Sequence, residues 1–252
     1  MIGISSPTFS FLPFDQVLEE LVKDFKLWEI VAEFEHNLPA NEAKISYARD
    51  SYGMKFQVHA PIADLNIGCP AGNLREAAVK EIFTLMDACD RLSIDIITFH
   101  PGMAVAYGEN IKPKVREATK ISLKEIDRKQ KDLHVKMALE NMPPADWSIG
   151  YDLHELLTML DGTDIGICFD TGHANVAHTI DTFLNDDYKL LNVHIHNNSG
   201  SWDEHLVINK GSMDIASVIA SLSKHYNGNY VIESRNPQEG IESRDILKKL
   251  LA

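Results

Sequence analysis

Side chains of the kinds that bind metal ions recur at regular places along this 252-residue chain. Short runs rich in β-branched and aromatic residues end in, or directly before, a histidine or a carboxylate. These residues are His59, His100, Glu140, Asp170, His194 or His196, and Glu233. Imidazole and carboxylate ligands without thiolates are typical of Zn²⁺ or Mn²⁺ sites and less so of Mg²⁺ sites. We therefore expect Zn²⁺ as the cofactor, with Mn²⁺ or Mg²⁺ as alternatives.

Two further motifs add ligands. Asp170-Thr171-Gly172-His173 places a carboxylate and an imidazole three residues apart, across a glycine that permits a tight turn. Asp203-Glu204-His205 forms a D-x-H pair. The candidate ligands are then His59, His100, Glu140, Asp170, His173, His194, Asp203, His205 and Glu233. They exceed the four to six positions around one ion, so we expect two or three ions sharing bridging carboxylates, as in metal-dependent phosphoester hydrolysis.

The elements that must position these residues alternate between strand-like and helix-like patterns. The expected strands are Ile2–Ser5, Leu27–Phe34, Lys55–His59, Ile94–His100, His134–Glu140, Ile165–Asp170, Leu190–His196 and Asn229–Glu233. Apolar residues at helical spacing predict helices over Leu74–Leu92, Lys114–Arg128, Met213–His225 and Ile241–Leu251. Alternating strands and helices indicate a parallel sheet.

The number of these units predicts the fold class. Eight strand-and-helix units in 252 residues fit an α/β fold, one (β/α)₈ barrel domain over residues 1–252, better than an open doubly wound sheet. The carboxyl ends of the strands of such a barrel converge on one mouth, where active sites lie. We therefore expect the ligand residues to share one site.

Charge and composition limit the partners. The net charge is −13, and the expected mouth loops 64–70, 103–110 and 142–150 contain no Lys or Arg. DNA therefore remains possible but is disfavoured, because phosphate contacts need clustered cations. No apolar run approaches the ~20 residues of a membrane span. Three scattered cysteines and the absence of a signal-peptide pattern lead us to expect a cytoplasmic enzyme.

Four other residues are candidates for binding a phosphoester or sugar-phosphate substrate. Arg235 follows Glu233 by two residues, and Lys210 precedes a helix start that suits a phosphate. Glu33 lies near the end of the second strand, where it would bind hydroxyl groups, and His196 shares a strand face with His194. For Arg235 and Glu33, a surface or salt-bridged role is an equal alternative.

Seven motifs occur in a characteristic order from the third strand onward. They resemble the xylose isomerase-like TIM barrel superfamily (AP endonuclease family 2) and are most similar to its endonuclease IV branch. The motifs are Val58-His59-Ala60-Pro61, Phe99-His100-Pro101-Gly102, Ala138-Leu139-Glu140-Asn141, Phe169-Asp170-Thr171-Gly172-His173, Val193-His194-Ile195-His196-Asn197, Asp203-Glu204-His205 and Val231-Ile232-Glu233.

The endonuclease IV resemblance implies three zinc ions, with Glu140 bridging two of them near the attacking water. The other positions would be Asp170, His194 and Glu233 for the inner pair, His173, Asp203 and His205 for the ion nearest the leaving group, and His59 and His100 for the outer ion. We expect a phosphoester hydrolase resembling this abasic-site endonuclease, with Glu140 and Glu233 as catalytic residues.

A sugar or sugar-phosphate isomerase or epimerase is the alternative. In such members of the superfamily, the positions similar to Glu140, Asp170, His194 and Glu233 hold one Mn²⁺ or Mg²⁺, and two glutamates exchange the sugar's proton. The seventh-strand motif of the endonuclease branch reads His-Leu-Asn-Asp, whereas this chain has His194-Ile195-His196-Asn197. Either histidine can therefore be the ligand, and the motif register favours His194.

Overall fold

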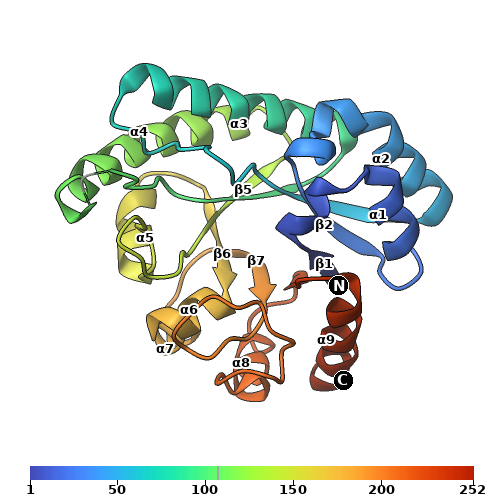
Figure 1. Cartoon of the computed structure of the whole chain (residues 1–252). Helices are drawn as coiled ribbons and strands as arrows, with labels where there is room; N and C mark the ends of the chain where they lie inside the picture. Colours follow the sequence, from blue (N-terminus) through green and yellow to red (C-terminus); the bar gives the residue numbers. More distant parts are fainter. Residues whose placement is uncertain (107) are drawn as a thin grey trace.

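The chain folds into a closed parallel β-barrel surrounded by helices, as a computed structural model that describes residues 1–106 and 108–252 shows (Figure 1). Consecutive strands pair in order, and the first also pairs with the eighth. The strands are β1 (Ile2–Ser5), β2 (Leu27–Val31), β3 (Lys55–His59), β4 (Ile96–Phe99), β5 (Lys136–Glu140), β6 (Gly166–Asp170), β7 (Leu190–Ile195) and β8 (Tyr230–Glu233). The expected (β/α)₈ barrel is confirmed.

Helices form the outer layer of the barrel, and α9 packs beside β1 and β8. The α-helices are α1 (Phe14–Leu21), α2 (Leu38–Tyr52), α3 (Gly72–Leu92), α4 (Lys112–Gln130), α5 (Leu153–Leu160), α6 (Thr171–Ala177), α7 (Ile180–Asn185), α8 (Ile215–Leu222) and α9 (Pro237–Leu250). Short 3₁₀ turns are η1 (Pro7–Phe11), η2 (Phe34–His36) and η3 (Gly108–Asn110). None of the helices in the described part of the chain combines the length and apolar character that a membrane crossing needs.

Six strands, β2 and β4 to β8, are shorter than their sequence patterns predict, three of them (β5, β6 and β8) by only one or two residues at the start. β2 ends at Val31 rather than Phe34, because Phe34 adopts a left-handed conformation (φ 49°) and opens the turn η2. β4 begins at Ile96, and β7 ends at Ile195. His196 therefore lies just beyond its strand. Apolar periodicity continues past a strand end when the following turn is also buried, so it does not mark the last paired residue.

The outside of the barrel carries an apolar layer, but its interior is polar. Outside, Trp28 packs against Phe14, with ring centroids 4.9 Å apart. The inside of the barrel contains polar side chains that are shielded from solvent. The residues Glu29, Gln57, Thr98 and Asn192 are each exposed to solvent by 1% or less. A typical barrel interior is filled with branched apolar side chains. The polar interior here therefore requires internal hydrogen bonds, because buried polar groups are costly without them.

Two glycines let the loops after β3 and β4 touch. A Cβ atom on Gly102, the glycine of the Phe99-His100-Pro101-Gly102 motif, would overlap the backbone of Gly68 and the hydroxyl of Thr119. Gly68 would meet the same neighbours in return. This contact holds together the loop that follows His59, the last residue of β3, and the loop that begins with His100, directly after β4.

We expect Gly102→Ala to destabilise the protein by about 1–3 kcal/mol, the usual cost of overpacking a tight contact. The measurement is urea-induced unfolding followed by circular dichroism. Gly72→Ala is the matched control, since nothing lies within 4 Å of an added Cβ at that helical position. Equal unfolding midpoints for the two variants would show that the contact between the loops does not matter.

Candidate metal centre

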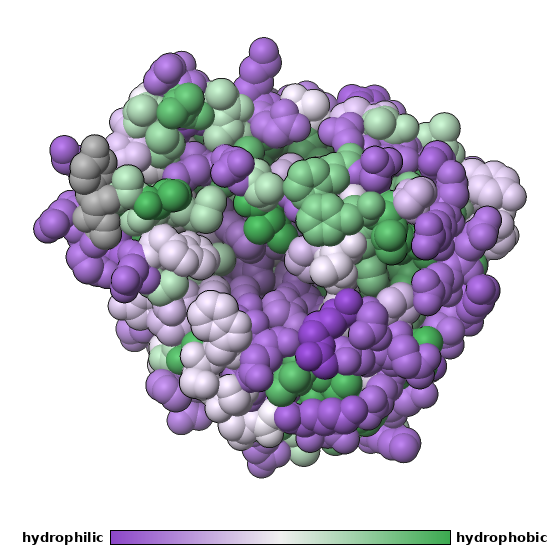
Figure 2. Space-filling model, in the orientation of Figure 1, coloured by the Kyte–Doolittle hydropathy of each residue, from purple (hydrophilic) through white to green (hydrophobic). Residues whose placement is uncertain are grey.

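The predicted ligand residues come together at the carboxyl ends of the strands. Figure 2 shows this face of the molecule hollowed in the middle, with a hydrophilic floor and hydrophobic residues along part of the border. The cavity has a volume of about 320 Å³. Its lining includes the predicted ligands His59, His100, Glu140, His173, Asp203, His205 and Glu233. Asp170, His194 and His196 lie buried beneath them.

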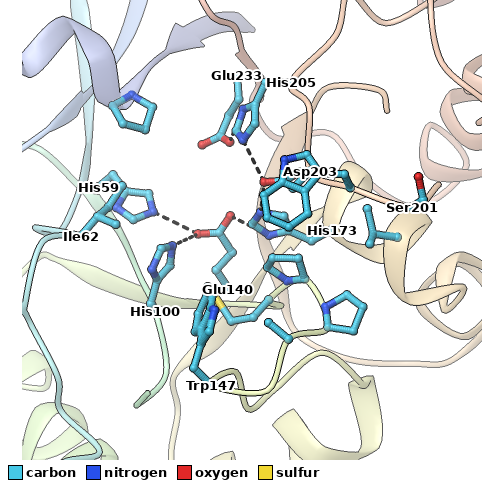
Figure 3. A pocket seen from close by; sticks show the side chains of 17 residues that line it. His59, Ile62, His100, Glu140, Trp147, His173, Ser201, Asp203, His205 and Glu233 are labelled. Atoms are coloured by element: carbon cyan, nitrogen blue, oxygen red, sulfur yellow. Dashed lines mark hydrogen bonds and ion pairs between the residues drawn. The ribbon is translucent and has the colours of Figure 1, made fainter. Parts of the chain in front are cut away.

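Glu140, the last residue of β5, lies at the centre of this group (Figure 3). One carboxylate oxygen is 3.0 Å from His59 Nε2 and 3.2 Å from His100 Nε2, and the other is 2.9 Å from His194 Nδ1. Burial alone would raise the pKa of Glu140, but the surrounding imidazoles, His194 foremost, hold it well below its usual range. Glu140 therefore stays ionised although it is 1% exposed.

Two histidines are oriented by backbone carbonyl groups. His59 Nδ1 donates to its neighbour Ala60 O at 2.7 Å, and His173 Nδ1 donates to Asn141 O at 2.8 Å. Each bond leaves Nε2 facing the site, towards Glu140 for His59 and towards Asp203 for His173. Metal-binding histidines are characteristically fixed by such a bond from the other ring nitrogen.

A second group of ligand atoms lies on and below a loop. Donor atoms of His173, His196, Asp203 and His205 are all within 4.8 Å of one another. The loop is closed at its base by two backbone hydrogen bonds between Asn197 and Leu206, at 3.1 and 2.7 Å. His205 has a left-handed backbone (φ 48°), and its ring stacks on that of His196 at 4.1 Å. Strained backbone of this kind is typical of functional sites.

His194 and His196 differ sharply in their contacts. Both ring nitrogens of His194 face carboxylates, Nε2 at 2.7 Å from Glu29 and Nδ1 at 2.9 Å from Glu140. His196 Nε2 lies 3.2 Å from Asp170 Oδ1, and a donor atom of His196 is grouped with donors of Asp170 and Glu233. The structure thus brings both histidines to the centre. The ring nitrogens of His196 are less engaged in hydrogen bonds and so more available to an ion, whereas the motif register predicts His194 as the ligand.

Unpaired atoms test whether the group fits a cation. Among the buried atoms without a well-formed hydrogen bond to the described residues, four belong to these ligand groups: Asp170 Oδ2, Asp203 Oδ1 and both ring nitrogens of His196. Buried polar atoms without partners are rare in folded proteins. These atoms belong to residues grouped by their mutual distances, and all are good ligands for Zn²⁺ or Mn²⁺. The residues present therefore fit a divalent ion.

Gly172 matters to this group through space rather than through a turn. It lies within α6 beside His173, and an added Cβ would overlap the imidazole of His196. The predicted reason for this glycine, a tight turn, is therefore wrong. The absence of a side chain lets His196 reach Asp170, whose side chain caps α6 by accepting from His173 N at 2.6 Å.

Three of the predicted substrate-binding residues lie outside the cavity lining. Arg235 forms an ion pair with Glu239 at 2.6 Å, and Lys210 forms one with Glu242 at 3.0 Å. Glu33 accepts hydrogen bonds from the backbone of residues 62 and 63, at 2.8 and 2.9 Å. Glu33 therefore fixes the loop that carries Ile62, a residue of the cavity wall.

The apolar wall was mostly not predicted from the sequence. It consists of Pro7, Ile62, Met142, Pro143, Pro144, Ala145, Trp147, Val176 and Trp202. Residues 142–147 come soon after Glu140, at the end of a strand that carries a predicted ligand. This position is the sequence feature from which their place in the cavity wall could have been predicted. Glu29 was missed as well, although a charged residue amid apolar ones in an internal barrel strand is a recognisable exception.

Comparison with known proteins places the chain in a family. The sequence pattern of the xylose isomerase-like TIM barrel family matches residues 21–250. The chain belongs to this family. Within it, the chain is 31% identical to the uncharacterized protein MJ1311 of Methanocaldococcus jannaschii, over 99% of this chain and 88% of that one.

Two further relatives of the chain differ in what their names imply. The crystal structure of a D-tagatose 3-epimerase-like protein superposes with a TM-score of 0.91 at 30% identity, covering 99% of this chain and 96% of that one. A probable endonuclease 4 of Aquifex aeolicus is 27% identical over 72% of this chain and 70% of its own length.

The protonation of His196 generates a prediction about pH. Burial would lower the pKa of this imidazole, but the carboxylates of Asp170, Asp203 and Glu233 raise it to about 9. Below that pH an incoming ion must displace the proton, so affinity for Mn²⁺ should rise about tenfold per pH unit from about pH 7 towards pH 9. Titration calorimetry in buffers of different ionisation enthalpy counts the released protons. A pH-independent affinity across this range would contradict the assignment of His196 as a ligand.

Proposed function

We propose that this protein is a divalent-metal-dependent isomerase or epimerase of a small sugar. The observation that carries the proposal is the placement of two glutamates in one small cavity. Oxygens of Glu140 and Glu233 lie 2.9 and 3.1 Å from the same nitrogen, His194 Nδ1. Figure 3 shows the two carboxylates entering the same space from β5 and β8.

The glutamates can do the proton chemistry of such a reaction. Neighbouring imidazoles, His194 foremost, hold the pKa of Glu140 and that of Glu233 below their usual range, so both side chains are ionised and can act as bases. One carboxylate takes the proton from the carbon beside the sugar's carbonyl group and, now protonated, returns it to the neighbouring carbon in an isomerisation. In an epimerisation, the other glutamate delivers a proton that it has taken up from water to the opposite face of the same carbon. A divalent ion, when bound by Asp170, His196 and the two glutamates, would supply polarisation of the sugar oxygens.

The cavity favours a sugar without a phosphate group. None of the described residues that line it is a Lys or an Arg. The nearest predicted cations, Arg235 and Lys210, are already paired with Glu239 and Glu242. A volume of about 320 Å³ lies at the lower end of small-molecule sites and suits a single sugar.

These observations support the alternative sequence interpretation over the main one. A phosphoester hydrolase was the leading expectation, and the D-tagatose 3-epimerase-like protein, which matches nearly the whole chain, favours the isomerase or epimerase instead. The identity of the ion remains a prediction: Zn²⁺ from the histidine count, with Mn²⁺ or Mg²⁺ as alternatives.

We expect Glu140→Gln and Glu233→Gln each to lower turnover by at least about a hundredfold, because an amide cannot accept the proton and general base catalysis typically contributes that much. The assay incubates free ketoses and aldoses with Mn²⁺-loaded protein in D₂O and follows deuterium uptake at carbon by NMR.

Glu242→Gln is the control, since this exposed glutamate pairs with Lys210 outside the cavity. Near-wild-type deuterium uptake by either cavity variant would contradict the assigned roles. Absence of uptake by the wild-type protein across the panel of sugars would refute the proposed function itself.

A multi-ion phosphoester hydrolase is the second candidate, favoured by the group of His173, His196, Asp203 and His205. Ligand atoms of His59, His100 and Glu140 form a further group. Together with the resemblance to endonuclease 4 of Aquifex aeolicus, these groups leave room for more than one ion. An isomerase needs only the ion held between Asp170, His196 and the glutamates.

The loop residues separate the two candidates. We expect Asp203→Ala and His205→Ala to retain one tightly bound ion per chain, because neither residue belongs to the group formed by Asp170, His196 and Glu233. Elemental analysis of the purified variants measures this, alongside cleavage of an abasic-site DNA duplex by the wild type. Cleavage by the wild type, with loss of an ion and of cleavage in both variants, would establish the hydrolase.

A further inference from the structure

A buried carboxylate beneath the site, Glu29, belongs to none of the groups of possible metal ligands among the described residues. Glu29 lies in the middle of β2, paired in register with Gln57 of β3, and is fully shielded from solvent. Its Oε2 accepts from Asn192 Nδ2 at 2.8 Å and from Gln57 Nε2 at 3.4 Å. Gln57 is held in turn by Asn229 Nδ2, at 2.7 Å from its Oε1. The position of Glu29 is therefore fixed from the adjacent strand β3 and, across the barrel interior, from β7.

The other oxygen of Glu29 points up the barrel to His194. His194 Nε2 lies 2.7 Å from Glu29 Oε1. On its far side, Nδ1 lies 2.9 Å from Glu140 Oε1 and 3.1 Å from Glu233 Oε1. Carboxylates only accept hydrogen bonds, so the ring donates downward to Glu29 and upward to the glutamates. One imidazole thus connects the barrel floor with both proposed catalytic groups.

We propose that Glu29 is a positioning residue, which through His194 fixes the side chains of Glu140 and Glu233. The catalytic part of this inference rests on the proposed function, and the geometric part does not. His194 is then a spacer between carboxylates, and His196 is the histidine that remains for the ion.

The cost of burying Glu29 argues that it has such a role. An ionised carboxylate inside a protein is destabilising unless it is paired, and apolar residues usually replace buried pairs without loss of stability. A barrel interior needs only packed apolar side chains at this depth. Here one polar layer, including Thr98 Oγ1 at 3.0 Å from Asn192 Nδ2, is devoted to holding Glu29 in one orientation.

The test is Glu29→Gln in the full-length chain, with the affinity for Mn²⁺ measured by titration calorimetry. The amide has nearly the same volume as the carboxylate, but one of its two polar atoms is an NH₂ donor instead of an acceptor. We expect this change to displace the His194 ring and, with it, the side chains of Glu140 and Glu233. We expect affinity to fall by about tenfold to a hundredfold, as when partners of metal ligands are removed. Asp127→Asn is the matched control, because Asp127 is a buried carboxylate with its own partners, Gln130 and Lys131, outside the barrel.

A double-mutant cycle shows whether Glu29 acts through His194. We expect Glu29→Gln to change Mn²⁺ affinity by less than about twofold once His194→Gln is present, since coupled residues are non-additive. The proposal would be overturned if the losses of Mn²⁺ affinity in the two single variants added up in the double variant. It would also be overturned if Glu29→Gln alone bound Mn²⁺ as tightly as the Asp127→Asn control. Glu29→Asp, which keeps the charge and shortens the reach, serves in the same cycle if Glu29→Gln does not fold.

Turnover gives the second readout. With an active sugar, Glu29→Gln should lower kcat about tenfold or more while KM changes by less than about twofold, because Glu29 does not line the cavity. A wild-type protein without sugar turnover would refute the proposed function alone, and the Mn²⁺ cycle would still decide the role of Glu29.

Discussion

The structure depends on burying opposite charges together at one end of the barrel. Four carboxylates and four imidazoles are almost fully shielded there: Glu29, Glu140, Asp170, Glu233, His59, His173, His194 and His196. Neither set is tolerable alone, because an unpaired buried charge costs several kcal/mol. The parallel strands place opposite charges next to each other. Asp170 of β6 and His194 of β7, for example, are register partners and therefore lie at the same height along the barrel axis. The loops, the glycine contacts and the polar floor all follow from keeping these charges in register.

Much of this arrangement could be predicted from the sequence, because the barrel makes strand ends equivalent. Glu140, Asp170 and Glu233 each end a strand, and a closed parallel barrel brings such ends to one mouth. The strand pattern does not predict how deep in the barrel a side chain lies. His194 and His196 share a face by alternation, and only the three-dimensional position of Glu29 distinguishes the deeper histidine from the shallower one.

The remaining errors have physical causes of the same kind. Glu33 looked like a mouth-facing carboxylate, but the left-handed turn at Phe34 ends the strand early and directs Glu33 to the loop at Ile62. Arg235 looked like a substrate-binding cation, but α9 begins at Pro237 and places Glu239 one helical turn away. In both cases the local backbone, a left-handed residue or a helix start, determines the partner of the charged side chain. The apolar periodicity of the sequence does not predict such features. Relatives of the chain include one named a probable endonuclease 4 and one named D-tagatose 3-epimerase-like, so the resemblance identifies the barrel and not the reaction.

The closure of the Asn197–Leu206 loop has a consequence for how such a site changes over time. Asp203 and His205 are carried entirely by this excursion, whereas Glu140, Asp170 and Glu233 are built into strands. An insertion, a deletion or a substitution above the two pinning hydrogen bonds alters the second group of ligands and leaves the barrel register untouched. The chain therefore keeps the carboxylates at the strand ends structurally separate from the two ligands that the loop carries. Sequence change in this loop can therefore vary one part of the site while the folding of the barrel is unaffected.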